Sequence, residues 1–168
     1  YKGYPQFSAP DEFLYAIRDA GFDVLLTANN HCLDRGQKGL ERTIAKLDSL
    51  GIPYAGTYQN NQIKNVRYPL ILEKKGIRIA LLNYTYGTNG FKTTGSNVVN
   101  YIDKAAISRD IELARAQKVD VIIACMHWGE EYKQIPSSAQ KEMAMWLIKQ
   151  GVNHVIGSHP HVVQPIVV

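Results

Sequence analysis

The segment from Val119 to Met126 is a nearly unbroken run of apolar residues, and it constrains the fold more than any other part of the chain. Strands with such sequences are buried on both faces, as in parallel sheets that helices cover. Residues 103–117 before this run and 138–150 after it have the apolar spacing of helices, and a second apolar strand follows at 152–156. This alternation of helix and strand predicts an α/β fold in which helices cover a sheet.

The rest of the chain predicts further elements of both kinds. A helix begins at Pro10-Asp11-Glu12 and ends at Gly21, because proline and acidic residues favour the first helical turn. The remaining expected elements are strands over 22–27, 52–55 and 162–168, a helix over 36–50, a β-hairpin formed by 68–72 and 77–83, and a loop over 84–100.

The length and composition fit one domain with a sizeable core. The chain has 168 residues, of which 45% are hydrophobic and 20% charged, as in ordinary globular proteins. The formal net charge is +4, but lysines and arginines are scattered among acidic residues. Such a mixed surface carries no block of positive charge, and no nucleic-acid reader motif accompanies it, so we expect no nucleic-acid partner.

The two cysteines, Cys32 and Cys125, are too few for a disulfide framework, and neither belongs to a CxxC pair. Their sequence context favours two free thiols packed in the core. A bridge between them remains open if the two strand ends are neighbours.

Candidate ligands for a metal ion follow three of the expected strands. Asn30 and His31 follow the strand at 22–27, His127 follows Met126, and His159 and His161 follow the strand at 152–156. Ligands bind at the carboxyl ends of strands in an open α/β sheet, so we expect these side chains to share one edge. Imidazole is the commonest protein metal ligand, and a set of histidine and asparagine suits a borderline divalent metal.

Three nearby residues are open to interpretation. Asp34 lies three positions after His31, where it can hold the imidazole in one orientation or cap the helix at 36–50. Glu131 follows the long strand in a loop, and we favour a substrate-binding role for it over simple solvation. His154 lies within the expected strand at 152–156, and we interpret it as a structural residue.

Three motifs together resemble the CapA family, the bacterial capsule-synthesis or poly-γ-glutamate type of domain. They are Ala28-Asn29-Asn30-His31 with Asp34 and Gly36, His127-Trp128-Gly129 with Glu131-Tyr132, and Gly157-Ser158-His159-Pro160-His161 with Gln164. The fold of this family is similar to that of the calcineurin-like metallophosphoesterases. The resemblance therefore implies a single domain over residues 1–168, with a layered α/β/β/α arrangement.

The resemblance also implies roles for matching residues. His31 matches the histidine that approaches the substrate as a general acid, with Asp34 beside it. The implied cofactor is one or more divalent ions of Mn, Zn or Fe, held by the residues that match the superfamily's neutral ligands, namely Asn30, His127, His159 and His161.

The chain departs from the superfamily pattern in its acidic ligands. The first aspartate motif and the bridging acid belong before the Asn-His motif, where this chain has only residues 1–27. Asp11 and Asp19 fall on the expected helix or its exit, and Asp23 lies at the wrong end of its strand. We therefore expect a fragment that lacks a strand or two at its amino terminus and binds metal weakly or not at all.

Three functions remain open on these grounds. The first is a metal-dependent hydrolase of a phosphoester or related bond. The second is a non-catalytic component of capsule assembly or export that binds an anionic polymer, and the third is a degenerate fold whose histidines hold no metal. Expected partners are an anionic polymer or phosphoester substrate and other capsule-assembly proteins. The expected location is the cell envelope, with a membrane anchor outside this chain and the domain outside the cytoplasm.

Overall fold

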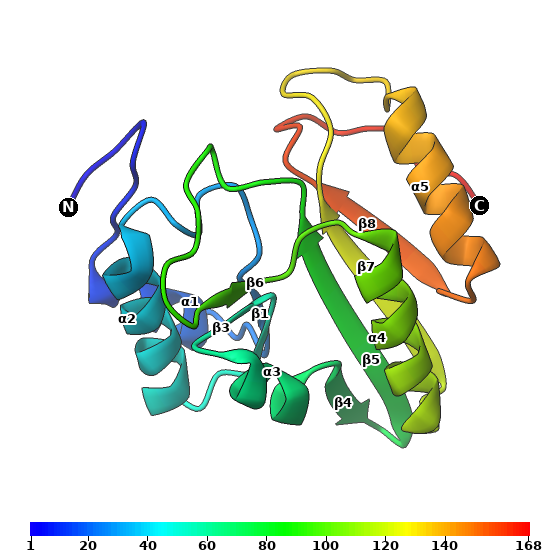
Figure 1. Ribbon diagram of the computed structural model, residues 1–168, viewed down its shortest axis with the longest axis horizontal. Helices are drawn as coiled ribbons and strands as arrows, with labels where there is room; N and C mark the ends of the chain where they lie inside the picture. The colour runs from blue at the N-terminus through cyan, green and yellow to red at the C-terminus, as the bar shows by residue number, and fades with distance from the viewer.

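Strand β7 (Val121–His127) lies inside the largest sheet, as its apolar sequence predicts. It pairs in parallel with β5 (Ile77–Thr85) on one side and with β8 (His154–Ser158) on the other, while β4 (Leu70–Lys74) pairs antiparallel with β5. The computed structural model, which describes residues 1–168, thus contains a four-stranded sheet of order β4-β5-β7-β8 (Figure 1). Because β5, β7 and β8 are parallel, their carboxyl ends meet at one edge.

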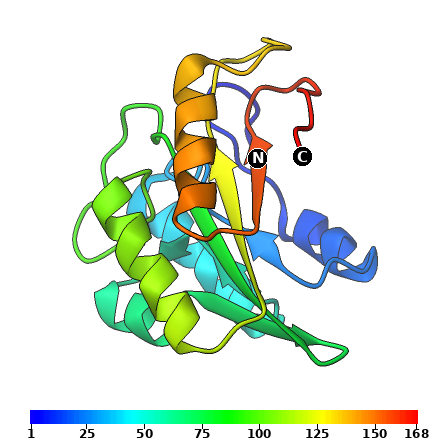
Figure 2. The ribbon, with the colours of Figure 1, turned by 90° about the vertical axis from the view of Figure 1, so that its right-hand side faces the viewer.

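Two helices cover one face of this sheet. Helix α4 (Lys104–Ala116) is capped by Asp103, and α5 (Ser138–Lys149) begins with a capping box formed by Ser137 and Gln140. Figure 2 shows both helices on the same side of the strands. Their apolar residues join the strands in one core, and burying each large side chain contributes about 1.5–3 kcal/mol. Members of this core include Leu82, Ala124, Met126, Ile107, Ile111 and Leu147.

The amino-terminal half adds short elements beside β5, on the side away from β8 (Figure 1). Strand β1 (Leu25–Leu26) pairs in parallel with β2 (Tyr54–Ala55), and β3 (Thr57–Tyr58) pairs antiparallel with β6 (Val98–Val99). The helices of this half are α1 (Asp11–Asp19), α2 (Gly36–Ser49) and α3 (Asn61–Arg67). No helix of the chain has both the length and the apolar character that a membrane crossing needs.

A close backbone approach at Gly56 joins the amino-terminal half to the sheet. Its φ is 121°, and an added Cβ would lie 2.2 Å from Asn83 Oδ1 and 2.4 Å from the Ala28 nitrogen. Asn83 Oδ1 accepts a hydrogen bond from the Ala28 N–H at 2.8 Å, and Asn83 Nδ2 donates to the Cys125 carbonyl at 3.2 Å. These contacts hold the turn after β1 beside β5 and β7.

The structure confirms the α/β class and most of the expected elements. The helices at 36–50, 103–117 and 138–150 and the hairpin at 68–83 are present within a residue or two of the expected bounds. The strands expected at 22–27 and 52–55 shrink to β1 and β2, because only two residues of each pair with a neighbouring strand.

The strand expected at 162–168 is wrong, since these residues follow β8 without joining any sheet. Val163 and Ile166 are each 91% exposed. β-branched residues favour a strand only where a partner supplies hydrogen bonds and a surface to pack on. The sequence also missed α3 and the pairing of β3 with β6, which lies partly in the expected loop.

Both cysteines are free thiols, which confirms the interpretation from the sequence and rules out a bridge between them. Burial raises the pKa of the Cys32 thiol and of the Cys125 thiol to about 11. We expect iodoacetamide to alkylate the native protein near pH 8 at least tenfold more slowly than the urea-unfolded protein, because the thiolate is the reactive form. Mass spectrometry of the alkylated protein measures both rates. Equal rates in the two states would contradict this prediction.

Candidate metal centre

The carboxyl edge of the sheet forms a cavity of ≈ 390 Å³. It brings together the five side chains that the sequence placed at three strand ends, namely Asn30, His31, His127, His159 and His161. Asn83 and Ser158 also line this cavity, and no lysine or arginine does. The positive charge that an anionic ligand needs is therefore not supplied by the side chains of the cavity wall.

Asn30 and His127 face each other across the cavity. His127 Nε2 lies 2.9 Å from Asn30 Oδ1, and His127 Nδ1 lies 3.0 Å from the Ser158 hydroxyl. The amide is only 5% exposed, although the two residues are 97 positions apart in the chain. Two potential metal-ligand atoms therefore meet at a point that bulk water reaches poorly.

Asn89 sets the orientation of this amide. Asn30 Nδ2 donates to Asn89 Oδ1 at 3.3 Å, which leaves Asn30 Oδ1 directed toward His127. The Asn89 amide nitrogen also lies 3.4 Å from His31 Nδ1. Asn89 has a left-handed φ of 50° and precedes Gly90, a dipeptide that favours tight turns. The sequence interpretation missed Asn89. The Asn-Gly pair was the one local sequence feature that indicated a tight turn there.

His31 is held by a buried carboxylate. Its Nδ1 lies 2.8 Å from Asp34 Oδ2, which also accepts the Phe7 backbone N–H at 2.8 Å. The Phe7 ring packs edge-on against the imidazole at 4.7 Å. The alternative of Asp34 as the cap of the helix at 36–50 is wrong, because Arg35 occupies that position and no side chain caps α2. Asp34 instead orients His31, whose Nε2 makes no hydrogen bond to the protein.

His159 and His161 follow β8 on a turn with unusual backbone geometry. Their φ values are 97° and 60°, in the region that side-chain-bearing residues rarely adopt. The His159 ring packs 4.9 Å from the His127 ring and 4.8 Å from the Tyr86 ring. Strained residues of this kind persist where surrounding contacts over-determine them, which is common at functional sites.

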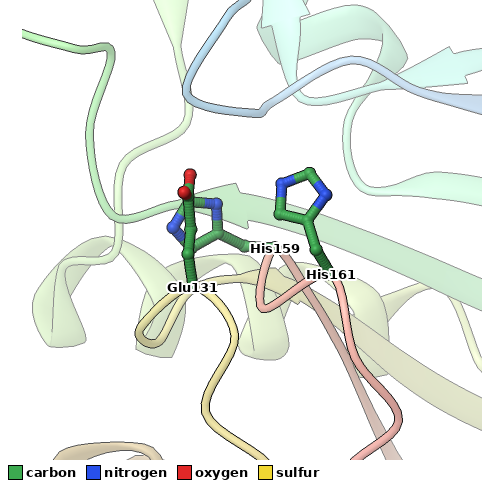
Figure 3. A group of neighbouring side chains, drawn as sticks. All are labelled: Glu131, His159 and His161. Atoms are coloured by element: carbon green, nitrogen blue, oxygen red, sulfur yellow. The ribbon is translucent and has the colours of Figure 1, made fainter.

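Glu131 reaches the same histidines from the loop after β7. Its carboxylate and the two imidazoles of His159 and His161 offer ligand atoms that lie within 4.8 Å of one another (Figure 3). His154 lies at the opposite end of β8, where its side chain is exposed. It lies within β8 and outside the cavity lining.

Burial keeps the central imidazoles neutral. It lowers the pKa of His127 to about 4, and the nearby His159, His161 and His31 add to the effect. Burial is also the main cause of the lowered pKa of His159. Neutral imidazole is the form that binds metals, so both rings are ready to act as ligands at neutral pH.

Tyr86 and Asn83 are further residues of the site that sequence reasoning missed. Tyr86 follows β5 directly, its backbone N–H donates to the His127 carbonyl at 3.0 Å, and its ring stacks parallel to the His127 ring. Neither residue belongs to a motif that contains histidine or acid. Their place near the end of β5 brings Asn83 to the cavity wall and the Tyr86 ring against His127 and His159.

Comparison with known proteins identifies the family of the chain. The family model for the bacterial capsule synthesis protein PGA_cap matches residues 1–168, and the chain belongs to this family. It is 31% identical over 166 residues to the capsule biosynthesis protein CapA of Bacillus anthracis, covering 94% of this chain and 39% of that protein. It is 28% identical over 158 residues to the PGA biosynthesis protein CapA of Bacillus subtilis (strain 168), covering 92% of this chain and 41% of that protein.

The resemblance inferred from the three motifs is thereby confirmed. The mixed α/β fold is consistent with the metallophosphoesterase-like architecture expected from it. The chain spans about two fifths of the length of the curated relatives it matches.

The lowered pKa of His127 predicts a pH dependence of stability for the metal-free protein. The ordinary pKa of 6.5 applies to the unfolded chain, so between that value and about 4 the unfolded state binds more protons than the folded state. The free energy of unfolding should therefore fall as the pH decreases through this window. Urea denaturation at several pH values should give a shallower dependence for His127→Gln. An identical dependence in both proteins would contradict the assignment.

Proposed function

We propose that this chain forms the metal-binding part of a hydrolase that acts on a phosphoester or related bond in the synthesis of a capsule or of poly-γ-glutamate. One observation carries the proposal. His31, oriented by Asp34, opens onto the same cavity as four potential metal ligands. A proton donor beside a set of metal ligands is the arrangement that hydrolysis of such a bond requires.

The residues present fit a divalent ion. Asn30, His127, His159 and His161 offer amide oxygen and imidazole nitrogen, which suit Zn, Mn or Fe. Asn30 Oδ1 and His127 Nε2 already converge at 2.9 Å, and Asn89 and Ser158 hold the two side chains from behind. When bound, the ion supplies Lewis acidity toward a phosphoryl oxygen. Since no lysine or arginine lines the cavity, recognition of an anionic group depends on that ion.

His31 has the geometry of a general acid. Nδ1 lies against the Asp34 carboxylate, so Nε2 is the nitrogen that, in the doubly protonated imidazolium, would donate its proton to the leaving oxygen and leave His31 neutral. The Phe7 ring packs edge-on against the imidazole and supports this orientation. General acid catalysis of this kind contributes about 10²–10⁴-fold to the rate.

The relatives' names support the biological setting. They are called a capsule biosynthesis protein and a PGA biosynthesis protein. We infer that the present chain acts at the cell envelope on an anionic polymer or its precursor, together with other capsule-assembly proteins. In this proposal a membrane anchor lies outside residues 1–168, and the domain works outside the cytoplasm.

The hydrolase proposal predicts a distinct kinetic effect of His31. With Mn²⁺ or Zn²⁺ and a nitrophenyl phosphoester, His31→Ala in the full-length protein should lower kcat by about 10²–10⁴-fold and leave metal affinity nearly unchanged. His159→Ala should lower both activity and metal affinity. His154→Ala is the matched control, because that imidazole is exposed at the far end of β8. Activity that survives the combined loss of His31 and His159 would refute the proposal.

A non-catalytic role in polymer assembly is the second candidate. It is favoured by the absence of aspartate and glutamate from the cavity wall, since two-metal hydrolases use bridging carboxylates. This role predicts that poly-γ-glutamate binds the protein, that a chelator abolishes binding, and that His31→Ala leaves binding unchanged. Calorimetric titration measures all three. Failure of the polymer to bind would eliminate this candidate.

A further inference from the structure

We infer that Glu131 is a direct metal ligand, which forms with His159 and His161 a three-ligand position for a divalent ion of the zinc or iron class. This inference rests on the proposed metal centre and assigns it the anionic ligand that Asn30 and the histidines do not provide. It replaces the substrate-binding role that the sequence suggested for Glu131. Sets of two histidines and one carboxylate bind Zn²⁺ or Fe²⁺ and leave coordination positions open for water and substrate.

The positions of the three side chains support this role. One ligand atom from each lies within 4.8 Å of the others. Figure 3 shows the Glu131 carboxylate beside the His159 ring, with the His161 ring next to them and all three projecting to the same side of their loops. Ligand atoms about 2.0–2.2 Å from a zinc ion lie roughly 3–3.5 Å apart, so small side-chain rotations suffice to close the set.

His159 has a nitrogen that no protein group uses. The residue is only 8% exposed, and its Nδ1 is buried without a hydrogen-bond partner. Buried polar atoms are nearly always paired, because an unpaired one destabilises the folded state. An imidazole that lacks protein partners on a buried nitrogen is free to bind a cation.

Hydrogen bonds tie the two loops that carry the cluster to each other. The Tyr132 N–H donates to the Pro160 carbonyl at 2.7 Å, which joins the residue after Glu131 to the residue between the two histidines. Gln164 extends this link, because it donates to the Lys133 carbonyl at 2.8 Å and accepts from Gln140 at 3.1 Å. These hydrogen bonds hold the loop that carries Glu131 against the loop that carries the two histidines.

Backbone strain marks the same place. Tyr132 has a φ of 62°, so left-handed residues stand beside Glu131 as well as at His159 and His161. Gly129 has a φ of 95°, and a Cβ there would lie 2.7 Å from the Gln140 side chain. Each strained non-glycine residue destabilises the chain, yet the folded structure keeps Tyr132, His159 and His161 in this conformation. The strain is consistent with a loop shape that serves to bring the carboxylate to the imidazoles.

The test is the affinity of the full-length protein for Zn²⁺, measured by competition with a chromophoric chelator. We expect Glu131→Gln to weaken binding by at least roughly 100-fold, since even the loss of an outer-shell partner weakens metal sites by about 10–100-fold. Glu130→Gln is the matched control, because it removes the same charge from the adjacent exposed residue that lies outside the cluster. It should bind Zn²⁺ within twofold of the wild type. The metal-free variants should unfold at the wild-type temperature, and the visible spectrum of bound Co²⁺ should change only in Glu131→Gln.

The outcomes separate this inference from the function on which it rests. If the wild type binds Zn²⁺ and Glu131→Gln binds it equally well, Glu131 is not a ligand, while the metal centre and the hydrolase proposal stand. A higher KM with unchanged Zn²⁺ affinity would return Glu131 to a substrate-binding role and overturn the inference. If the wild type does not bind Zn²⁺, Mn²⁺ or Fe²⁺, the proposed metal centre itself is refuted.

Discussion

The contact between the Asn83 side chain and the Ala28 backbone holds the two halves of the molecule in register. Asn83 lies on β5, accepts the Ala28 N–H and donates to the Cys125 carbonyl on β7, while Gly56 leaves room for this approach. The amide is only 3% exposed, so losing it would leave buried backbone groups unpaired at about 1–3 kcal/mol each. This contact therefore positions the turn that follows Ala28, with Asn30 and His31, opposite β7.

The site that this contact positions combines uncharged potential metal ligands with hydrogen-bond partners that hold them. Each central side chain has a partner that fixes its orientation: Asp34 for His31, Asn89 for Asn30, and Ser158 for His127. Burial keeps His127 and His159 uncharged by lowering their pKa values. Neutral imidazoles need not release the second proton that a charged imidazolium would have to lose before it binds a cation. Asp34 is engaged with His31, so Glu131, which lies beside His159 and His161, is the carboxylate best placed to add negative charge.

The elements that could be predicted are those with a long local pattern. The apolar run of β7 covers the whole strand, and the apolar spacing of α2, α4 and α5 extends over more than two helical turns in each. The local sequence is therefore enough to define these elements. Strands β1, β2, β3 and β6 have two residues each and exist only because a partner lies beside them. The segment 162–168 shows the reverse case. Its β-branched residues favour a strand, but no neighbouring strand pairs with it.

For the site, the sequence by itself determined the family and the residue types at three strand ends, because motif spacing and strand direction are local properties of the chain. The tertiary structure alone decided which atoms face one another: Asn30 Oδ1 meets His127 Nε2 across 97 positions of sequence. It also paired Asp34 with His31, placed Asn83 and Asn89 at the site, and brought Glu131 to His159 and His161. The physical reason is that parallel pairing aligns strand ends regardless of their separation in the chain, whereas side-chain orientation depends on hydrogen-bond partners that come from distant segments.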